Sequence, residues 1–184
     1  MNSTPFIAPA TRRLQASPVA PPSSVKAHLI FAVDGEYYAC PIENIEHVLR
    51  RSDANVQPRS TNCPPWEVGR LARQTNDVPV ISLRVLWGLP DQAAETGREA
   101  LLVINLPDQS FALLVDECRT VISSLPPGTA RFPLPTQLRG TRGAAFDTAI
   151  HWQNQLIVTV QLQKLLSSEF DGLLAPGREA TANL

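Results

Sequence analysis

Short apolar runs separated by turn-forming residues recur along the chain from residue 28 onward. The first pair of runs flanks Asp34-Gly35, whose residues tolerate the positive φ angles of a two-residue hairpin turn. A second pair flanks Pro107-Asp108-Gln109, and a third flanks Gln153-Asn154. The pattern therefore predicts three β-hairpins, formed by strands 29–33 and 37–42, by strands 101–106 and 111–115, and by the two runs around Gln153-Asn154.

Other segments predict single strands and short helices. The run DVPVISLRVLWGLP favours a strand over residues 78–86. Residues 45–51 favour a short strand or one turn of helix, and Pro64-Pro65 at a first turn predicts a short helix around Trp66. Near the end of the chain, QKLLSSEFDGLL (residues 163–174) predicts an amphipathic helical end, with three leucines on one face: Leu162, Leu165 and Leu166.

The composition strengthens the interpretation as a mainly β protein. Of 184 residues, 17 are proline and 18% are charged, which is typical of a chain with many turns rather than of a helical bundle. Residues 38–48 can be laid over residues 111–121 without a gap, which indicates two related β modules with a boundary near residues 88–100. Short antiparallel strands of this kind favour small barrels, because closure removes exposed sheet edges.

The two ends of the chain differ in composition from its middle. Residues 1–25 are rich in proline, alanine and serine, which predicts a disordered arm that is either an inert tail or a docking peptide. Residues 26–170 hold the periodic apolar runs and are expected to form the folded domain. Residues 171–184 are expected to form a disordered tail.

The sequence carries little that resembles catalytic or cofactor chemistry. Its net charge of −1 favours neither nucleic acid nor an anionic membrane as a partner. The three cysteines (Cys40, Cys63 and Cys118) form no CxxC pair, the histidines lack metal-ligand spacing, and no glycine-rich phosphate loop occurs. No run approaches the roughly 20 apolar residues that span a bilayer. We therefore expect no catalytic residue, no metal, no cofactor and no membrane insertion.

These absences favour a binding role, through backbone edges and apolar patches, over an enzymatic one. A Cys/His hydrolase whose residues meet only in space is the least favoured alternative.

Three segments, in this order, resemble the CheW family of bacterial chemotaxis adaptors, which also includes the regulatory domain of the CheA kinase. LIFAVDGEYYACPIENIEHV, residues 29–48, is similar to the family's opening hairpin. PVISLRVLWG, residues 79–88, is similar to the family's strand P-[VI]-[IV]-D-L-R-x-x-[FL]-G, and Gly69 lies ten residues before its proline, where the family often has glycine. QLIVTVQLQKLLSS, residues 155–168, is similar to the family's last strand and helix. The resemblance covers residues 28–168.

The resemblance implies two five-stranded β-barrels of the Src-homology-three kind that share a hydrophobic core, with short helices including one at the C-terminus. It implies a non-enzymatic adaptor in the cytoplasm, at membrane-associated receptor arrays. Such adaptors join methyl-accepting chemoreceptors to the regulatory domain of a CheA-type histidine kinase. In the family the groove between the barrels receives a receptor hairpin tip, and other barrel faces dock on the kinase domain.

Two alternatives stay open at this point. One is a specialised CheW-like protein with altered partners, in polar localisation or type IV pilus-type signalling. The other is an unrelated β-barrel module that binds peptides.

The chain departs from the family pattern at several positions. The family commonly has glutamate at the position of His47, Arg-Gly at Gln74-Thr75 and aspartate at Ser82. The resemblance implies that the glutamate and arginine pair near the binding surface, so losing both is coherent, because losing one would leave an unpaired charge. We expect a hydrogen bond between His47 and Gln74 instead. The predicted partner-binding residues are Ile45, His47, Val48, Gly69, Gln74 and Thr75. Ile45 and Val48 are also candidates for the barrel core, which is the favoured interpretation for Val48.

Overall fold

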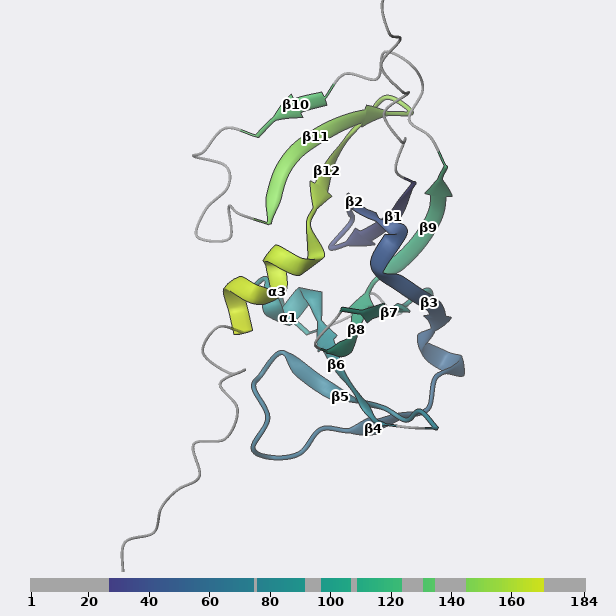
Figure 1. The fold of residues 1–184 in the computed structure, drawn as a ribbon, viewed down its shortest axis with the longest axis vertical. Coiled ribbons are helices and arrows are strands. Elements are labelled where there is room, and N and C mark those ends of the chain that lie inside the picture. Colours follow the sequence, from purple (N-terminus) through teal and green to yellow (C-terminus); the bar gives the residue numbers. More distant parts are fainter. Residues whose placement is uncertain are drawn as a thin grey trace, which may run out of the picture.

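The computed structural model describes residues 27–74, 76–91, 97–106, 109–123, 131–134 and 145–170. Within them the protein is mainly β, with two six-stranded sheets and short helices (Figure 1). The first sheet has the strand order β10 (Arg131–Pro133), β11 (Phe146–Trp152), β12 (Gln155–Val160), β2 (Glu36–Pro41), β1 (His28–Val33), β9 (Glu117–Ile122). The second has the order β3 (Ile45–Arg50), β7 (Ala100–Asn105), β8 (Ser110–Val115), β6 (Val78–Ser82), β5 (Glu67–Leu71), β4 (Val56–Pro58).

The mainly β class is confirmed, with six strands in each sheet rather than the five expected for each barrel. The helices are α1 (Leu83–Leu86) and α3 (Leu162–Phe170), and 3₁₀ turns lie at Ile42–Asn44 and Arg51–Asp53. The predicted arm (residues 1–25) and tail (residues 171–184) lie outside the described residues.

The three predicted hairpins are confirmed. β1 and β2 are joined by Asp34 and Gly35. Their φ angles of 54° and 80° suit a two-residue hairpin turn of type I′, which requires positive φ at both residues. β11 and β12 are joined in the same way by Gln153 and Asn154, with φ angles of 46° and 63°. β7 and β8 pair from Ala100↔Val115 to Asn105↔Ser110.

Each sheet gains one edge strand from the segment that follows the hairpin of the other sheet. After the β1–β2 hairpin the chain crosses to the second sheet, where β3 pairs with β7. After the β7–β8 hairpin it crosses back to the first sheet, where β9 pairs with β1. The chain therefore changes sheet after β2 and after β8, whereas residues 88–100, where the sequence placed the boundary, join two parts of the second sheet.

The exchange is part of an internal two-fold relation between strands β1–β6 and strands β7–β12. β6 pairs with β8 in parallel, and β12 pairs with β2 in parallel. The Ser82 amide donates to the Trp66 carbonyl at 2.9 Å, and the Gln161 amide donates to the Ala145 carbonyl at 2.8 Å, each just before a helix. The gapless overlay of residues 38–48 on 111–121 thus matches β2 and β3 to β8 and β9.

Two expected elements take another form. The segment around Trp66 is a turn, closed by the Glu67 amide donating to the Pro64 carbonyl at 3.0 Å, and β5 begins directly after it. The expected helix is absent because Glu67 pairs with Ile81 in the second sheet. The expected strand over residues 78–86 ends at Ser82, and its last four residues form α1.

Ser82 explains why the strand stops. It lies at the N-cap of α1, and its hydroxyl accepts a hydrogen bond from the Val85 amide at 3.3 Å. Serine and aspartate are both good N-cap residues, so the departure from the family's aspartate preserves the cap.

We expect Ser82→Ala to lower the free energy of unfolding by about 1 kcal/mol, because the Val85 amide loses its acceptor. Urea unfolding followed by circular dichroism measures the change. Ser82→Thr, which keeps the hydroxyl, serves as the control. Equal stability of the alanine and threonine variants would contradict the capping role.

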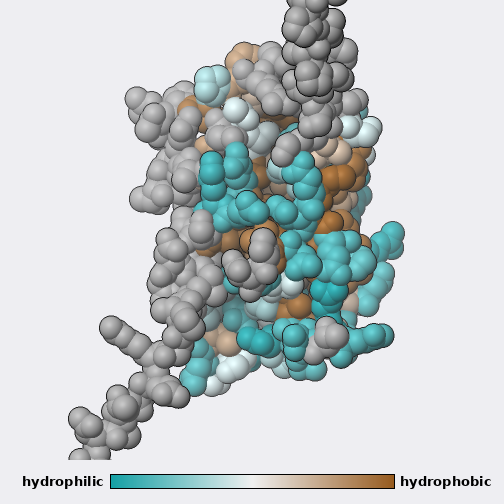
Figure 2. Space-filling view, viewed as in Figure 1, coloured by the Kyte–Doolittle hydropathy of each residue, from teal (hydrophilic) through white to brown (hydrophobic). Residues whose placement is uncertain are grey.

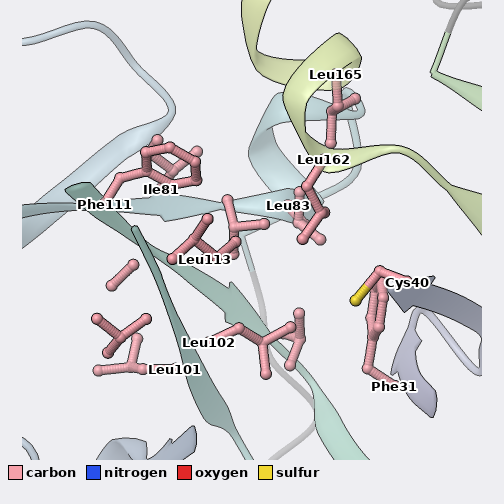
Figure 3. Packing of buried hydrophobic residues seen from close by; sticks show 14 of the residues in the cluster. Phe31, Cys40, Ile81, Leu83, Leu101, Leu102, Phe111, Leu113, Leu162 and Leu165 are labelled. Carbon is pink, nitrogen blue, oxygen red and sulfur yellow. The ribbon is translucent and has the colours of Figure 1, made fainter. Parts of the chain in front are cut away.

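The main hydrophobic core lies between the two sheets (Figure 3). Phe31 and Cys40 of the first sheet face Leu102 of the second, and Leu83 of α1 lies beside Leu162 of α3 (Figure 3). The predicted leucines of α3 are 0–3% exposed. A smaller cluster lies on the opposite face of the first sheet from the main core: Ile30, Ala39, Ile122, Ile150 and Ile157. The shared core implied by the resemblance is therefore present.

Aromatic rings add to the junction between the sheets. Trp87, which follows α1, lies 4.7 Å from Tyr38 and 5.8 Å from Phe146, measured between ring centroids. Both of these rings belong to the first sheet, so Trp87 packs between the two sheets. Burial raises the pKa of the Tyr38 phenol above its usual value.

Candidate functional site

An ion pair joins β3 to the segment that follows β5. Arg73 binds Glu46 through two parallel hydrogen bonds, Nη1 to Oε2 at 3.0 Å and Nη2 to Oε1 at 2.6 Å. The two side chains are 30% and 32% exposed, so the pair is accessible from solvent yet partly shielded by the protein. Two parallel bonds fix the direction of the carboxylate as well as its distance. The hydrogen bonds from Arg73 are the main reason why the pKa of Glu46 is lowered.

The position of this pair follows from a β-bulge in β3. Ile45 pairs with Ile104 and His47 with Val103, so Glu46 is an extra residue opposite the β7 ladder. A bulge redirects the side chains that follow it. Spacing along the sequence indicated that a glutamate at the position of His47 and an arginine at Gln74 were both missing. The structure instead pairs a glutamate and an arginine one residue earlier in each segment.

The predicted partner-binding residues of β3 lie around this pair. β3 is an edge strand, and Ile45 packs partly against the core. Val48 is 43% exposed, so its interpretation as a core residue is wrong. We call the exposed side chains of Glu46, His47, Val48 and Arg73 the β3 surface.

The expected hydrogen bond between His47 and Gln74 is not formed. The His47 Nε2 atom lies 3.4 Å from Glu46 Oε1 instead, and the imidazole is 59% exposed. Gln74 is exposed close to Arg73. Thr75 lies outside the described residues.

Gly69 has a structural reason to be glycine within the chain itself. It pairs with Pro58 of β4, and a Cβ atom added there would lie 2.5 Å from the Gln57 carbonyl oxygen and 2.7 Å from Val56 Cγ1. The close approach of β4 therefore excludes any side chain at this position.

A groove of about 490 Å³ lies between the edges of the two sheets. Its walls come from the end of β3, the start of β7 and the start of β9. The apolar lining residues are Val48, Leu49, Ala100 and Cys118. Charged side chains from both sheets stand at the same groove: Arg50, Arg98 and Glu117.

Exposed apolar residues continue from this groove along both edge strands. Val48 and Leu49 of β3 are 43% and 36% exposed, and Val121 of β9 is 50% exposed. Figure 2 shows hydrophobic residues reaching the surface on the side where Figure 1 places β9 and β3. Contiguous exposed apolar patches are common at protein–protein interfaces, so these residues are candidates for a partner contact.

Sequence reasoning missed three parts of this site. The bulge that selects Glu46 has no signal in residue spacing, and Arg73 was therefore passed over. The groove combines strands that lie far apart in the chain. The sequence held one signal for the groove. In the match of residues 38–48 to residues 111–121, Val48 aligns with Val121.

Two further features of the described residues bear on function. They contain no group of three or more histidine, cysteine, aspartate or glutamate side chains that could hold a metal ion. None of their helices has the length and the apolar character needed to cross a membrane.

Comparisons with known proteins give a consistent result. The family model of the CheW-like domain matches residues 27–170. Among solved structures, the chain is similar to the scaffolding protein TtCheW from Thermoanaerobacter tengcongensis, with a TM-score of 0.62 and 19% sequence identity. That match covers 77% of this chain and 92% of the other. No curated protein sequence matches the chain. Because the family model covers most of the chain, the protein belongs to the CheW-like domain family, whose members are non-enzymatic scaffolds.

Proposed function

We propose that the protein is a chemotaxis adaptor that joins methyl-accepting chemoreceptors to the regulatory domain of a CheA-type histidine kinase. It acts in the cytoplasm, at membrane-associated receptor arrays. The observation that carries the proposal is the Glu46–Arg73 pair on the β3 surface, next to exposed Val48. The resemblance to the CheW family implies a glutamate–arginine pair near the binding surface, and this pair supplies it.

The β3 surface is the proposed site for the kinase domain. An oriented ion pair selects a partner by charge and register, while neighbouring apolar side chains contribute most of the binding energy. Ile45, His47, Gly69, Gln74 and Thr75 remain predicted parts of this site. Gly69 would act by allowing β4 to lie close to β5.

The groove between the sheets is the proposed site for the receptor hairpin tip. Its apolar lining suits the apolar side chains of a helical tip, and Arg50 suits an acidic residue beside them, whereas Arg98 lies 3.6 Å from the Glu117 carboxylate. The two proposed sites share Val48 and otherwise use different residues.

The test is calorimetric titration of the full chain with the CheA regulatory domain from the same genome, and separately with a receptor hairpin tip. We expect saturable binding of both at micromolar concentration. A chain that is folded by circular dichroism but binds neither would overturn the proposal. Binding of the receptor tip alone would favour the specialised adaptor with altered partners.

A further inference from the structure

A largely buried arginine side chain holds the point where the chain returns from the second sheet to the first. Arg84 of α1 is 12% exposed, and all three of its guanidinium nitrogens donate hydrogen bonds. Nη1 donates to Asp116 Oδ2 at 2.6 Å, and Nη2 donates to Asp34 Oδ1 at 2.9 Å. Nε donates to the Pro90 carbonyl at 3.0 Å. Asp34 lies in the β1–β2 turn of the first sheet, and Asp116 lies between β8 of the second sheet and β9 of the first, so one side chain joins the turn to the crossover.

Asp116 is the centre of this cluster. Its Oδ2 atom also accepts a hydrogen bond from the Asp34 amide at 2.7 Å, and its own amide donates to the Ala32 carbonyl at 3.1 Å. It is the single residue between β8 and β9, and is 16% exposed. These contacts fix the direction in which β9 leaves the crossover.

The residues directly after Asp116 form one wall of the groove. Glu117 and Cys118 line it at the start of β9, opposite Val48 and Arg98. A rotation of the crossover at Asp116 would therefore move this wall relative to β3.

The crossover after β2 has a different residue in the position of Arg84. By the matching hydrogen bonds before α1 and α3, the residue equivalent to Arg84 is Gln163, which is neutral and exposed. The crossover after β2 therefore forms with a glutamine in the position that Arg84 takes at the crossover after β8.

We propose that Arg84 is a positioning residue for the groove: through Asp116 it sets the position of the wall formed by Glu117 and Cys118. The inference deepens the proposed function, because it concerns the groove assigned to the receptor tip. Arg84 itself does not line the groove, so it acts on binding only through the crossover.

Two cysteines allow a test that needs no partner. Cys118 is partly exposed in the groove, whereas Cys40 is 0% exposed in the shared core. Burial raises the pKa of the Cys40 thiol to about 12, so at pH 7.5 it reacts with an alkylating agent only when the core opens. Cys40 therefore reports global unfolding, and Cys118 reports the groove wall.

The experiment compares iodoacetamide labelling rates of both thiols in the full chain by peptide mass spectrometry. We expect Arg84→Gln to increase the Cys118 rate about tenfold relative to the Cys40 rate. Loss of the arginine charge alone would slow a thiolate reaction, so an increase reports movement. Arg59→Gln, which removes an exposed arginine hydrogen-bonded to Pro65, is the control and should leave both rates unchanged.

A parallel increase of both rates would show a stabilising role only and would overturn the inference, as would unchanged labelling of Cys118. If Arg84→Gln does not fold, Arg84→Lys replaces it, because one ammonium group cannot hold both carboxylates in the same geometry. The lysine variant should then show a smaller selective increase at Cys118. Since labelling requires no receptor, failure of this inference is distinguishable from failure of the proposed adaptor function.

Discussion

Glu46→Arg is expected to weaken binding of the CheA regulatory domain by about 100-fold, because it places two like charges where the partner meets an oriented ion pair. Stability should change by less than about 1 kcal/mol, since ion pairs at the surface contribute little to folding. Calorimetry of the binding and urea unfolding of the free chain measure the two effects separately.

The reciprocal exchange Glu46→Arg with Arg73→Glu restores an ion pair of opposite direction and should recover at least part of the lost affinity. Glu36→Arg, a charge reversal at an exposed position of β2, is the matched control and should bind normally. If the Glu46 and Glu36 variants bind alike, the β3 surface does not contact the kinase domain.

Gly69→Ala is expected to destabilise the fold by about 2–3 kcal/mol, within the range found when a packed region is forced to hold extra atoms. The new methyl group would overlap the Gln57 carbonyl, which belongs to the backbone and has no rotamer to adopt. Replacing glycine by alanine at an unstrained position normally stabilises a chain slightly, so the sign of the effect is diagnostic. For a chain of this length the melting temperature should fall by roughly 5–10 °C.

Gly88→Ala separates steric overlap from backbone strain. Gly88 has a φ angle of 75° and open space around its Cα, so alanine there costs about 1–2 kcal/mol from conformation alone. The Gly69 variant should be the less stable of the two in urea. A Gly69→Ala variant as stable as the unaltered chain would show that β4 can withdraw freely from β5.

Hairpins could be predicted from the sequence because their signals are local. Asp34-Gly35 and Gln153-Asn154 need only their own backbone preferences to form turns, and both did so. The prediction of a helix around Trp66 was wrong because a long-range contact decides the local structure: Glu67 pairs with Ile81. The strand over 78–86 failed at Ser82, where a side-chain cap outweighed the apolar pattern.

The candidate site was harder to predict than the fold, because small changes of register decide it. One additional residue in β3 brings Glu46 to Arg73 and leaves His47 beside the pair. The groove lies between β3 and β9. The chain reaches β3, in the second sheet, after its first crossing, and it reaches β9, in the first sheet, after its second crossing. Residue spacing carries neither fact.

The exchange of β3 and β9 between the sheets also has a consequence for synthesis of the protein on the ribosome. All six strands of the second sheet have been made once β8 is complete, whereas the first sheet still lacks β9 to β12. The β1–β2 hairpin, with its buried Phe31 and Cys40, is synthesised first, but the sheet to which it belongs is completed last. At usual rates of translation it stays without most of its partner strands for on the order of ten seconds. During that interval the nascent chain exposes the apolar surface of the β1–β2 hairpin, and exposed surface of this kind makes an incomplete chain prone to aggregation.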